Sequence, residues 1–208
     1  MPIDLSKIYL YHITDIDNLP SILGASGLLS DSHVNGANTE VIGHLNIKAR
    51  RMQEIRVPCC ENRFVGEFVP FYFCPRSPML YSVNRGNTGR EPGCQRTIVH
   101  LVTSVAHAVG LEKGWAFSNG NAGAYHADFF GDLSELDQLD WEIIKSTDWG
   151  GDLRRHKKAA EFLVADSFDW SSIRAIGCYN SAALQRVEAL LGDQQNAAKV
   201  VVRSDWYY

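Results

Sequence analysis

Three short segments, far apart in the sequence, each place polar side chains beside an apolar run. They cover residues 11–14, 71–81 and 157–163. The first and third are typical of strands, and the second is typical of an aromatic strand followed by a helix that begins at Pro78. They constrain the fold because one site can use all three only if the chain brings their ends together.

The rest of the pattern alternates between strand and helix periodicity without a regular βαβ rhythm, which predicts an α+β fold. Strands are expected at residues 8–13, 68–73, 97–103, 161–165, 175–179 and 199–203, and helices at residues 16–23, 46–56, 78–85, 133–144 and 181–191. Asp17 and Ser181 are expected to cap helices, and Pro70 to lie at a strand edge or bulge. No repeat or linker divides the chain, so residues 1–208 are interpreted as one domain.

The composition excludes several classes of protein. No apolar stretch approaches the ~20 residues that cross a bilayer, and the first residues lack the basic-then-apolar plan of a signal peptide. The five cysteines include the adjacent pair Cys59 and Cys60 but no Cys-x-x-Cys. This pattern argues against a disulfide framework and a zinc site, so we expect no metal, no membrane contact and a reducing cytoplasm.

The net charge of −4 is unevenly distributed. Residues 128–152 hold eight acidic side chains and one basic one, whereas bases cluster within residues 48–56 and 154–158. Two local basic clusters on a mildly acidic chain fit a groove for a polyanion. Solvated helix or loop faces are the alternative interpretation.

Two polar strand residues and one carboxylate are candidates for chemistry. His12 and Thr14 point to the same face of the first strand, where they suit the edge of a ribose, although a hydrogen-bonded strand-end histidine is also possible. Glu161 opens an apolar strand directly after bases, so it can be partly buried yet ionised. The alternative is a surface Glu161 paired with Lys157 or Lys158.

Familiar nucleotide-binding and hydrolase motifs are absent from the sequence. There is no GxGxxG, no GxxxxGK[ST], no His-Glu-x-x-His and no Gly-x-Ser-x-Gly. The sequence therefore argues against a Rossmann or P-loop site. No motif is found in residues 31–45, 84–96 and 118–132. The stretch 84–96 is rich in glycine and basic residues, and it fits a mobile lid, a loop that binds a DNA strand or a plain surface loop.

In this order and over this span, the three segments resemble the DarT family of DNA ADP-ribosyltransferase toxins. The Arg-Arg pair at residues 50–51 and the ending Asp-Trp-Tyr-Tyr extend the resemblance from residue 8 to residue 208. The resemblance implies an ADP-ribosyltransferase-like fold, with central split mixed or antiparallel β-sheets flanked by helices. It also implies transfer of ADP-ribose from NAD, as co-substrate, onto a base of single-stranded DNA.

The resemblance also implies roles for particular residues. Catalysis is expected from Glu161 and Arg51, although the neighbouring Arg50 could exchange roles with Arg51. The residues expected to bind NAD are His12, Ile13, Thr14, Tyr72, Ser77 and Tyr81. Independently of the resemblance, the two basic clusters lead us to expect contacts with DNA from Lys48, Arg51, Arg154 and Arg155.

By the same resemblance, the protein is expected to be the toxin of a bacterial toxin–antitoxin pair, with a macrodomain-type antitoxin as partner. Overall similarity favours thymidine as the target. The alternatives are a guanosine-directed enzyme, a transferase that modifies protein or RNA, and a catalytically idle nucleic-acid-binding module.

Overall fold

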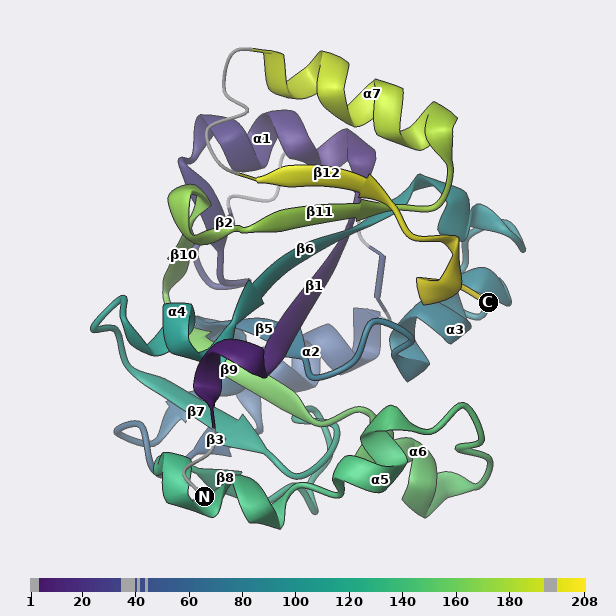
Figure 1. Cartoon of the computed structure of the whole chain (residues 1–208). Helices are drawn as coiled ribbons and strands as arrows, with labels where there is room; N and C mark the ends of the chain where they lie inside the picture. The colour runs from purple at the N-terminus through teal and green to yellow at the C-terminus, as the bar shows by residue number, and fades with distance from the viewer. Residues whose placement is uncertain (1–3, 35–39, 41, 44, 193–197) are drawn as a thin grey trace.

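A computed structural model describes residues 4–34, 40, 42–43, 45–192 and 198–208. Its centre is an eight-stranded sheet in the order β12-β11-β6-β1-β5-β9-β7-β8 (Figure 1). The strands of this sheet are β1 (Tyr9–Asp15), β5 (Phe68–Tyr72), β6 (Ile98–Ser104), β7 (Trp115–Ser118), β8 (Phe129–Phe130), β9 (Glu161–Ala165), β11 (Ala175–Cys178) and β12 (Lys199–Val202). Neighbouring strands pair antiparallel except β11 and β12, which are parallel, so the sheet is mixed.

Two small two-stranded sheets and seven helices complete the described fold. The small sheets pair β2 (Gly27–Leu29) with β10 (Ser167–Asp169), and β3 (Arg56–Val57) with β4 (Arg63–Phe64). The helices are α1 (Leu19–Gly24), α2 (Leu45–Gln53), α3 (Pro78–Asn84), α4 (Val105–Val109), α5 (Trp141–Lys145), α6 (Asp152–Lys158) and α7 (Ser181–Leu191). The expected α+β class is confirmed.

The large sheet splits between β1 and β5. Among the described residues these strands share one register pair, Tyr11 with Tyr72, whereas β1 follows β6 along its whole length and β5 follows β9 along its whole length. The expected split sheet is therefore present, and the split separates residues of the first segment from those of the second and third.

Pro70 explains how an interior strand can part from its neighbour. We expected a strand edge or bulge, but β5 lies between β1 and β9 in the sheet. The carbonyl of Pro70 accepts a hydrogen bond from His12 of β1, so the missing N–H of Pro70 faces the same side, where the ladder has opened. The expectation of an edge strand was therefore wrong. Proline is nevertheless tolerated here, because most of this side of β5 forms no ladder with β1 and needs no backbone N–H at residue 70.

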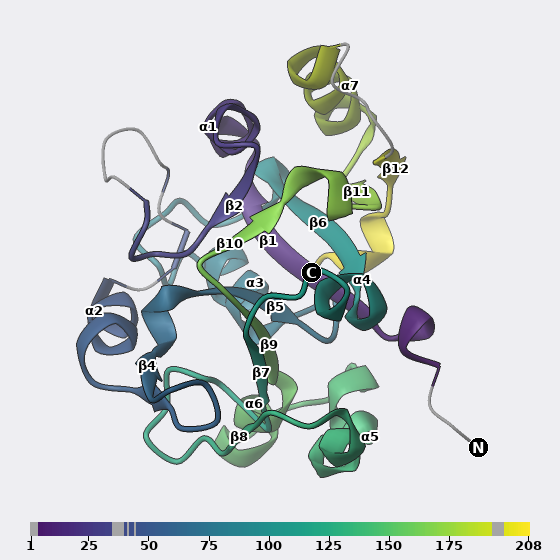
Figure 2. The ribbon, with the colours of Figure 1, turned by 90° about the vertical axis from the view of Figure 1, so that its left-hand side faces the viewer.

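The helices cover both sides of the sheet. Figure 1 shows α1 and α7 together near β11 and β12, with α5 and α6 at the opposite end of the molecule. Figure 2 shows α2 on one side of β1, β5 and β9, and shows α5 and the N-terminal segment on the other. The main core is built from buried residues of the strands, such as Leu10, Phe71 and Phe162, each with no exposed surface.

Two expected helix caps were wrong. Asp15 caps the first helical segment, a 3-10 turn at Ile16–Asn18 that leads into α1, because its carboxylate accepts from the backbone N–H of Asp17. Asn180 caps α7, because its side chain accepts from the N–H of Ala183. In both cases the capping residue lies before the expected position and keeps extended backbone angles. Within the described residues, no helix is long and apolar enough to span a bilayer.

Candidate active site

Glu161, the first residue of β9, forms a buried ion pair with Arg51 of α2. Arg51 Nη1 donates to both carboxylate oxygens, at 3.1 Å to Oε1 and 2.9 Å to Oε2. The two side chains are 11% and 2% exposed. The fold thus brings together the two residues expected to carry catalysis, although 110 positions separate them.

The lysines that precede Glu161 make other contacts. Lys157 Nζ lies 3.0 Å from a carboxylate oxygen of Asp140, and Lys158 Nζ donates to the carbonyl of Ile144 at 2.6 Å. The alternative interpretation of Glu161 as a surface partner of these lysines was therefore wrong.

A backbone N–H and a serine hydroxyl of the loop at residues 118–123 hold Glu161 from its other side. The N–H of Ala122 donates to Glu161 Oε1 at 3.0 Å, and the backbone N–H of Glu161 donates to Ser118 Oγ at 3.3 Å. Ser118 Oγ in turn donates to the carbonyl of Gly120 at 2.7 Å. These contacts could not be predicted from the sequence, because a backbone N–H donor has no residue signature.

Two glycines let this loop approach its neighbours closely. A Cβ on Gly120 would lie 2.0 Å from Nε2 of His156 in α6, and a Cβ on Gly123 would lie 3.0 Å from Ile47 in α2. The loop is therefore packed between α2 and α6, which carry the two basic clusters seen in the sequence.

Charge in this site is fixed by burial and by the ion pair. Burial acts to lower the pKa of Arg51, because it disfavours the charged guanidinium. The charge and hydrogen bonds of Glu161 have a larger combined effect in the opposite direction, so the pKa of Arg51 is raised. Tyr72 lies opposite Glu161 in the β5–β9 register, and burial followed by the Glu161 charge raises the pKa of Tyr72. The phenol therefore stays protonated at neutral pH. A fixed carboxylate in a site shielded from water is suited to stabilise positive charge on a nearby group.

The adjacent Arg50 points away from this pair. Its guanidinium lies 5.3 Å from the ring centroid of Tyr125 in a cation–π contact. Arg51, rather than Arg50, is thus the arginine that reaches Glu161.

His12 lies where β1 and β5 separate. Because a carbonyl can only accept, His12 Nδ1 donates the 2.8 Å hydrogen bond to Pro70 O. Burial is the main effect on His12 and lowers its pKa, so the ring is neutral around pH 7. A neutral imidazole that donates through Nδ1 keeps Nε2 as an acceptor.

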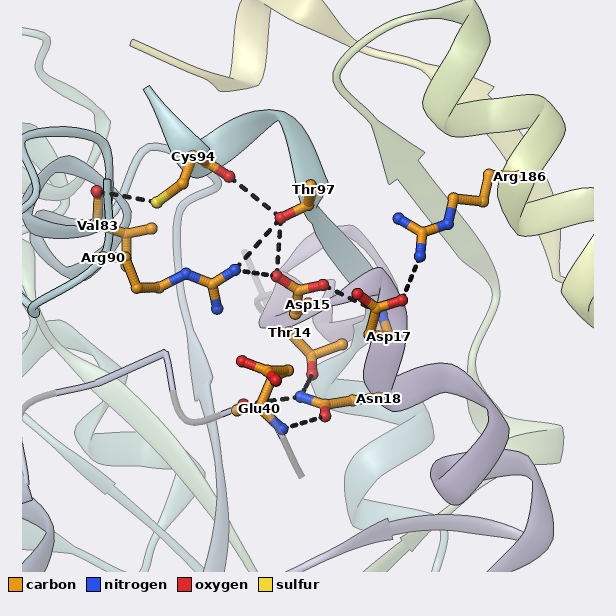
Figure 3. A network of polar contacts seen from close by, with 10 residues as sticks. All are labelled: Thr14, Asp15, Asp17, Asn18, Glu40, Val83, Arg90, Cys94, Thr97 and Arg186. Atoms are coloured by element: carbon orange, nitrogen blue, oxygen red, sulfur yellow. Dashed lines mark hydrogen bonds and ion pairs between the residues drawn. The ribbon is translucent and has the colours of Figure 1, made fainter. Parts of the chain in front are cut away.

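The end of β1 is fixed by a polar network (Figure 3). Asn18 Nδ2 donates to Thr14 Oγ1 at 3.1 Å, and the same amide exchanges two hydrogen bonds with the backbone of Glu40. Thr14 is 5% exposed. Ile13 packs its side chain into the core with Leu80, so any contact of Ile13 with a ligand would use its backbone.

Stretch 84–96 is attached to the same strand end. Figure 3 shows Arg90 directed at Asp15, with which it forms an ion pair, and Thr97 Oγ1 donates to the same carboxylate at 2.7 Å. Asp15 is 1% exposed. The sequence had left the role of this stretch open, and the structure shows that Arg90 anchors it beside Thr14.

The helix of the second segment presents one ring at the surface. Ser77 is fully buried, and its Oγ accepts from the N–H of Leu80 as the cap of α3. Tyr81 is 36% exposed and makes edge contacts with Trp149 and Tyr208, at centroid distances of 5.3 Å and 5.1 Å. Neither Trp149 nor Tyr208 was predicted to lie here.

The expected DNA contacts lie on the helices on either side of the loop at residues 118–123. Lys48 of α2 pairs with Asp31 at 2.9 Å. In α6, Arg155 pairs with Asp152 at 3.3 Å, and Arg154 donates to the carbonyl of Asp148. Exposed pairs of this kind are weak and exchange readily for a phosphate. Among the described residues, no three His, Cys, Asp or Glu side chains gather as metal ligands would.

The chain is similar to known DNA ADP-ribosyltransferases. Residues 11–208 match the family model described as "ssDNA thymidine ADP-ribosyltransferase, DarT". A DNA ADP-ribosyl transferase of Thermus sp. (strain 2.9) is 39% identical over 96% of this chain and 95% of its own length. Over 35% of this chain, a DNA ADP-ribosyl transferase–DNA ADP-ribosyl glycohydrolase fusion protein of Thermosipho africanus is also 39% identical, a match that covers 18% of the fusion protein.

Solved structures of the Thermus sp. 2.9 DarT have the same fold. Its complex with ADP-ribosylated single-stranded DNA matches with a TM-score of 0.90 and 37% identity, over 97% of this chain and 96% of that one. Its complex with NAD⁺ matches with a TM-score of 0.86 and 34% identity, over the whole of both chains.

Proposed function

The chain belongs to the DarT family of NAD-dependent DNA ADP-ribosyltransferases, and from this premise we propose that it modifies thymidine in single-stranded DNA. Residues 1–208 act as a single transferase domain, which moves ADP-ribose from NAD to the base and releases nicotinamide. The observation that carries the proposal is the buried Arg51–Glu161 pair beside the split in the sheet.

The side chains around the split fit NAD. The free Nε2 of His12 accepts a hydroxyl hydrogen from a ribose, and Thr14, held by Asn18, presents its hydroxyl from the same strand. The exposed ring of Tyr81 offers a face to the flat cation of nicotinamide. Tyr72, protonated opposite Glu161, serves as a donor at the same place. Ser77, whose hydroxyl caps α3, contributes through its backbone.

Bound NAD supplies a ribose carbon that becomes electron-poor as its bond to nicotinamide breaks. The carboxylate of Glu161 stabilises that charge, as a carboxylate does in glycoside hydrolysis. The new bond joins the ribose carbon to a base nitrogen, and Glu161 assists removal of the proton from that nitrogen. Arg51 holds the carboxylate in place and, with a guanidinium that suits phosphates and carbonyls, lies close to the NAD phosphates and the base.

DNA reaches this site between the two basic helices. Lys48 of α2 and Arg154 and Arg155 of α6 neutralise phosphates on either side of the loop that positions Glu161. A single strand is required, because the edge of a paired base is blocked.

Incubation of the purified protein with NAD and a single-stranded oligonucleotide tests the activity. We expect a mass increase of one ADP-ribose on an oligonucleotide in which thymine is present, and no increase when every thymine is replaced by cytosine. Modification of a thymine-free, guanine-containing strand would identify a guanosine-directed enzyme. Transfer of ADP-ribose to protein or RNA but not to DNA would identify a transferase that modifies those substrates. If none of the three is modified, the protein is a catalytically idle nucleic-acid-binding module.

Removal of the first segment's histidine should weaken NAD binding. Loss of hydrogen bonds at His12 predicts about a ten-fold lower NAD affinity for His12→Ala, equivalent to ~1.4 kcal/mol, by isothermal titration. Tyr81→Ala should weaken it similarly, whereas Tyr81→Phe, which keeps the ring, should bind NAD as the wild type does. Unchanged affinity in both alanine variants would show that these side chains are structural.

We also propose that the protein is a bacterial cytoplasmic toxin with a macrodomain-type antitoxin that removes ADP-ribose from DNA. Support comes from the Thermosipho africanus relative, which is named as a fusion of a DNA ADP-ribosyl transferase with a DNA ADP-ribosyl glycohydrolase. In that protein a DNA ADP-ribosyl transferase and a DNA ADP-ribosyl glycohydrolase share one chain.

A further inference from the structure

A cavity lies on the side of β5 and β9 away from α2. It has a volume of about 630 Å³, within the range of small-molecule sites, and it is bounded by the N-terminal segment, the β5–α3 connection and α5. Its lining includes neither Arg51 nor Glu161, and Figure 2 shows α5 on the opposite side of β5 and β9 from α2, so the cavity is separate from the Arg51–Glu161 pair.

The lining of this cavity is aromatic and basic. Its rings come from Tyr9, Tyr11, Phe73 and Trp141, and its bases are Lys7, Arg76, Lys145 and Lys158. Among the described residues, no acidic side chain lines the cavity, although the chain has more acids than bases. Tyr9 is 54% exposed, and Lys145 Nζ lies 5.9 Å from the ring centroid of Trp141. Flat rings beside cations are the features that bind a nucleotide, whose base stacks and whose phosphate needs positive charge.

Arg76 connects the cavity to the candidate active site. Its guanidinium lies 4.6 Å from the ring centroid of Tyr208, which in turn contacts Tyr81. The buried Nε of Arg76 makes no hydrogen bond to any described residue. A row of aromatic and cationic groups thus runs from the exposed ring of Tyr81 to the cavity, and one donor in this row is unsatisfied.

Lys158, one of the basic lining residues, is hydrogen-bonded to the backbone. Lys158 Nζ donates to the carbonyls of Ile144 and Ser146, at 2.6 Å and 2.8 Å, at the end of α5. Lys158 lies three residues before Glu161, so the cavity and the catalytic carboxylate are fixed by the same short stretch of chain.

We propose that this cavity is a second nucleotide-binding site, which takes a base and phosphate of the DNA strand outside the target nucleotide. Tyr9 stacks on the base, and Lys145 and Arg76 neutralise the phosphate. The proposal rests on the proposed function, because it assigns the nucleotide to the substrate strand.

Fluorescence anisotropy with labelled single-stranded DNA tests this site in the Glu161→Gln background, where the DNA stays unmodified. Two oligonucleotides are compared, one just long enough to be modified and one several nucleotides longer. We expect Tyr9→Ala to weaken binding of the longer strand about ten-fold, as loss of one stacked base does, and Tyr9→Phe to bind it as the parent does. The short strand should be affected less.

Salt dependence separates a phosphate contact from a change in folding. Lys145→Ala should reduce the slope of log affinity against log salt by about 0.7, the value for one phosphate on a single strand. Lys199→Ala is the matched control, because Lys199 is an exposed lysine on the far edge strand β12 and should leave the slope unchanged.

Unchanged affinity and slope in both Tyr9→Ala and Lys145→Ala would overturn the proposal. If dTMP binds the cavity while the affinity for DNA is insensitive to these variants, the assignment to the DNA strand is likewise overturned and the ligand is a free nucleotide. The result is independent of the proposed reaction. A wild-type protein that fails to modify DNA, with pocket variants that still lose DNA affinity, would defeat only the proposed function.

Discussion

Glu161→Gln is expected to lower the rate of ADP-ribose transfer by about 10²–10³ while the protein still folds and binds DNA. The amide has the shape of the carboxylate, so the Ala122 N–H and Arg51 Nη1 keep an oxygen to which they can donate. The negative charge is lost, and with it the group that stabilises positive charge on the ribose. Single-turnover rates with saturating NAD and a thymine-containing oligonucleotide measure the effect.

The buried ion pair makes a control for stability necessary. Loss of one partner of such a pair leaves the other charge uncompensated and destabilises a protein by about 3–5 kcal/mol. Thermal unfolding and DNA affinity of Glu161→Gln should therefore be measured beside its activity. Near-wild-type turnover in a folded Glu161→Gln protein would contradict the catalytic role.

Asp166→Asn offers a matched comparison. Asp166 directly follows the other end of β9, is a partly exposed carboxylate and pairs with Arg63 at 2.5 Å. Its backbone has a φ of 63°, which asparagine adopts readily. This substitution removes a paired carboxylate without touching the split, so turnover should stay close to that of the wild type.

The sequence predicted the parts of the fold that have strong periodicity or clear boundaries. The expected bounds of β9 and the expected last residue of α7 agree with the structure, because an apolar run and a repeating apolar face define them. Strand β7 was missed. Its apolar stretch, Trp115–Phe117, is too short to distinguish a strand from a loop, and its place between β9 and β8 depends on partners distant in the chain.

In the candidate site, the sequence predicted the functional side chains but not the backbone groups that hold them. Arg51 and Glu161 were identified from residue type and family resemblance, and the structure places them in contact. The N–H of Ala122 and the close approach of Gly120 to His156 could not be predicted, because backbone donors and missing Cβ atoms depend on tertiary packing. The Arg90–Asp15 pair likewise depends on tertiary structure, because it joins the end of β1 to the loop that precedes β6.

Expression of the wild-type protein in a bacterium that lacks an antitoxin should stop growth and DNA synthesis. A thymine with ADP-ribose on its base nitrogen cannot pair, so a replicating template would be blocked wherever it is modified. Incorporation of labelled thymidine should fall before incorporation of labelled amino acids, because the damage is to DNA. Co-expression of a macrodomain-type glycohydrolase should restore growth.

Glu161→Gln provides the control that links arrest to catalysis. It keeps the fold, the basic helices and the aromatic cavity, so a toxic effect that arose from DNA binding alone would persist in this variant. We expect cells that express this variant at the wild-type level to grow normally. When the rate of transfer is lower by about 10²–10³, modified bases form more slowly than DNA repair and cell growth remove them. Equal harmlessness of both proteins, with purified wild type folded and able to bind NAD, would defeat the toxin assignment. It would direct the search to protein or RNA substrates.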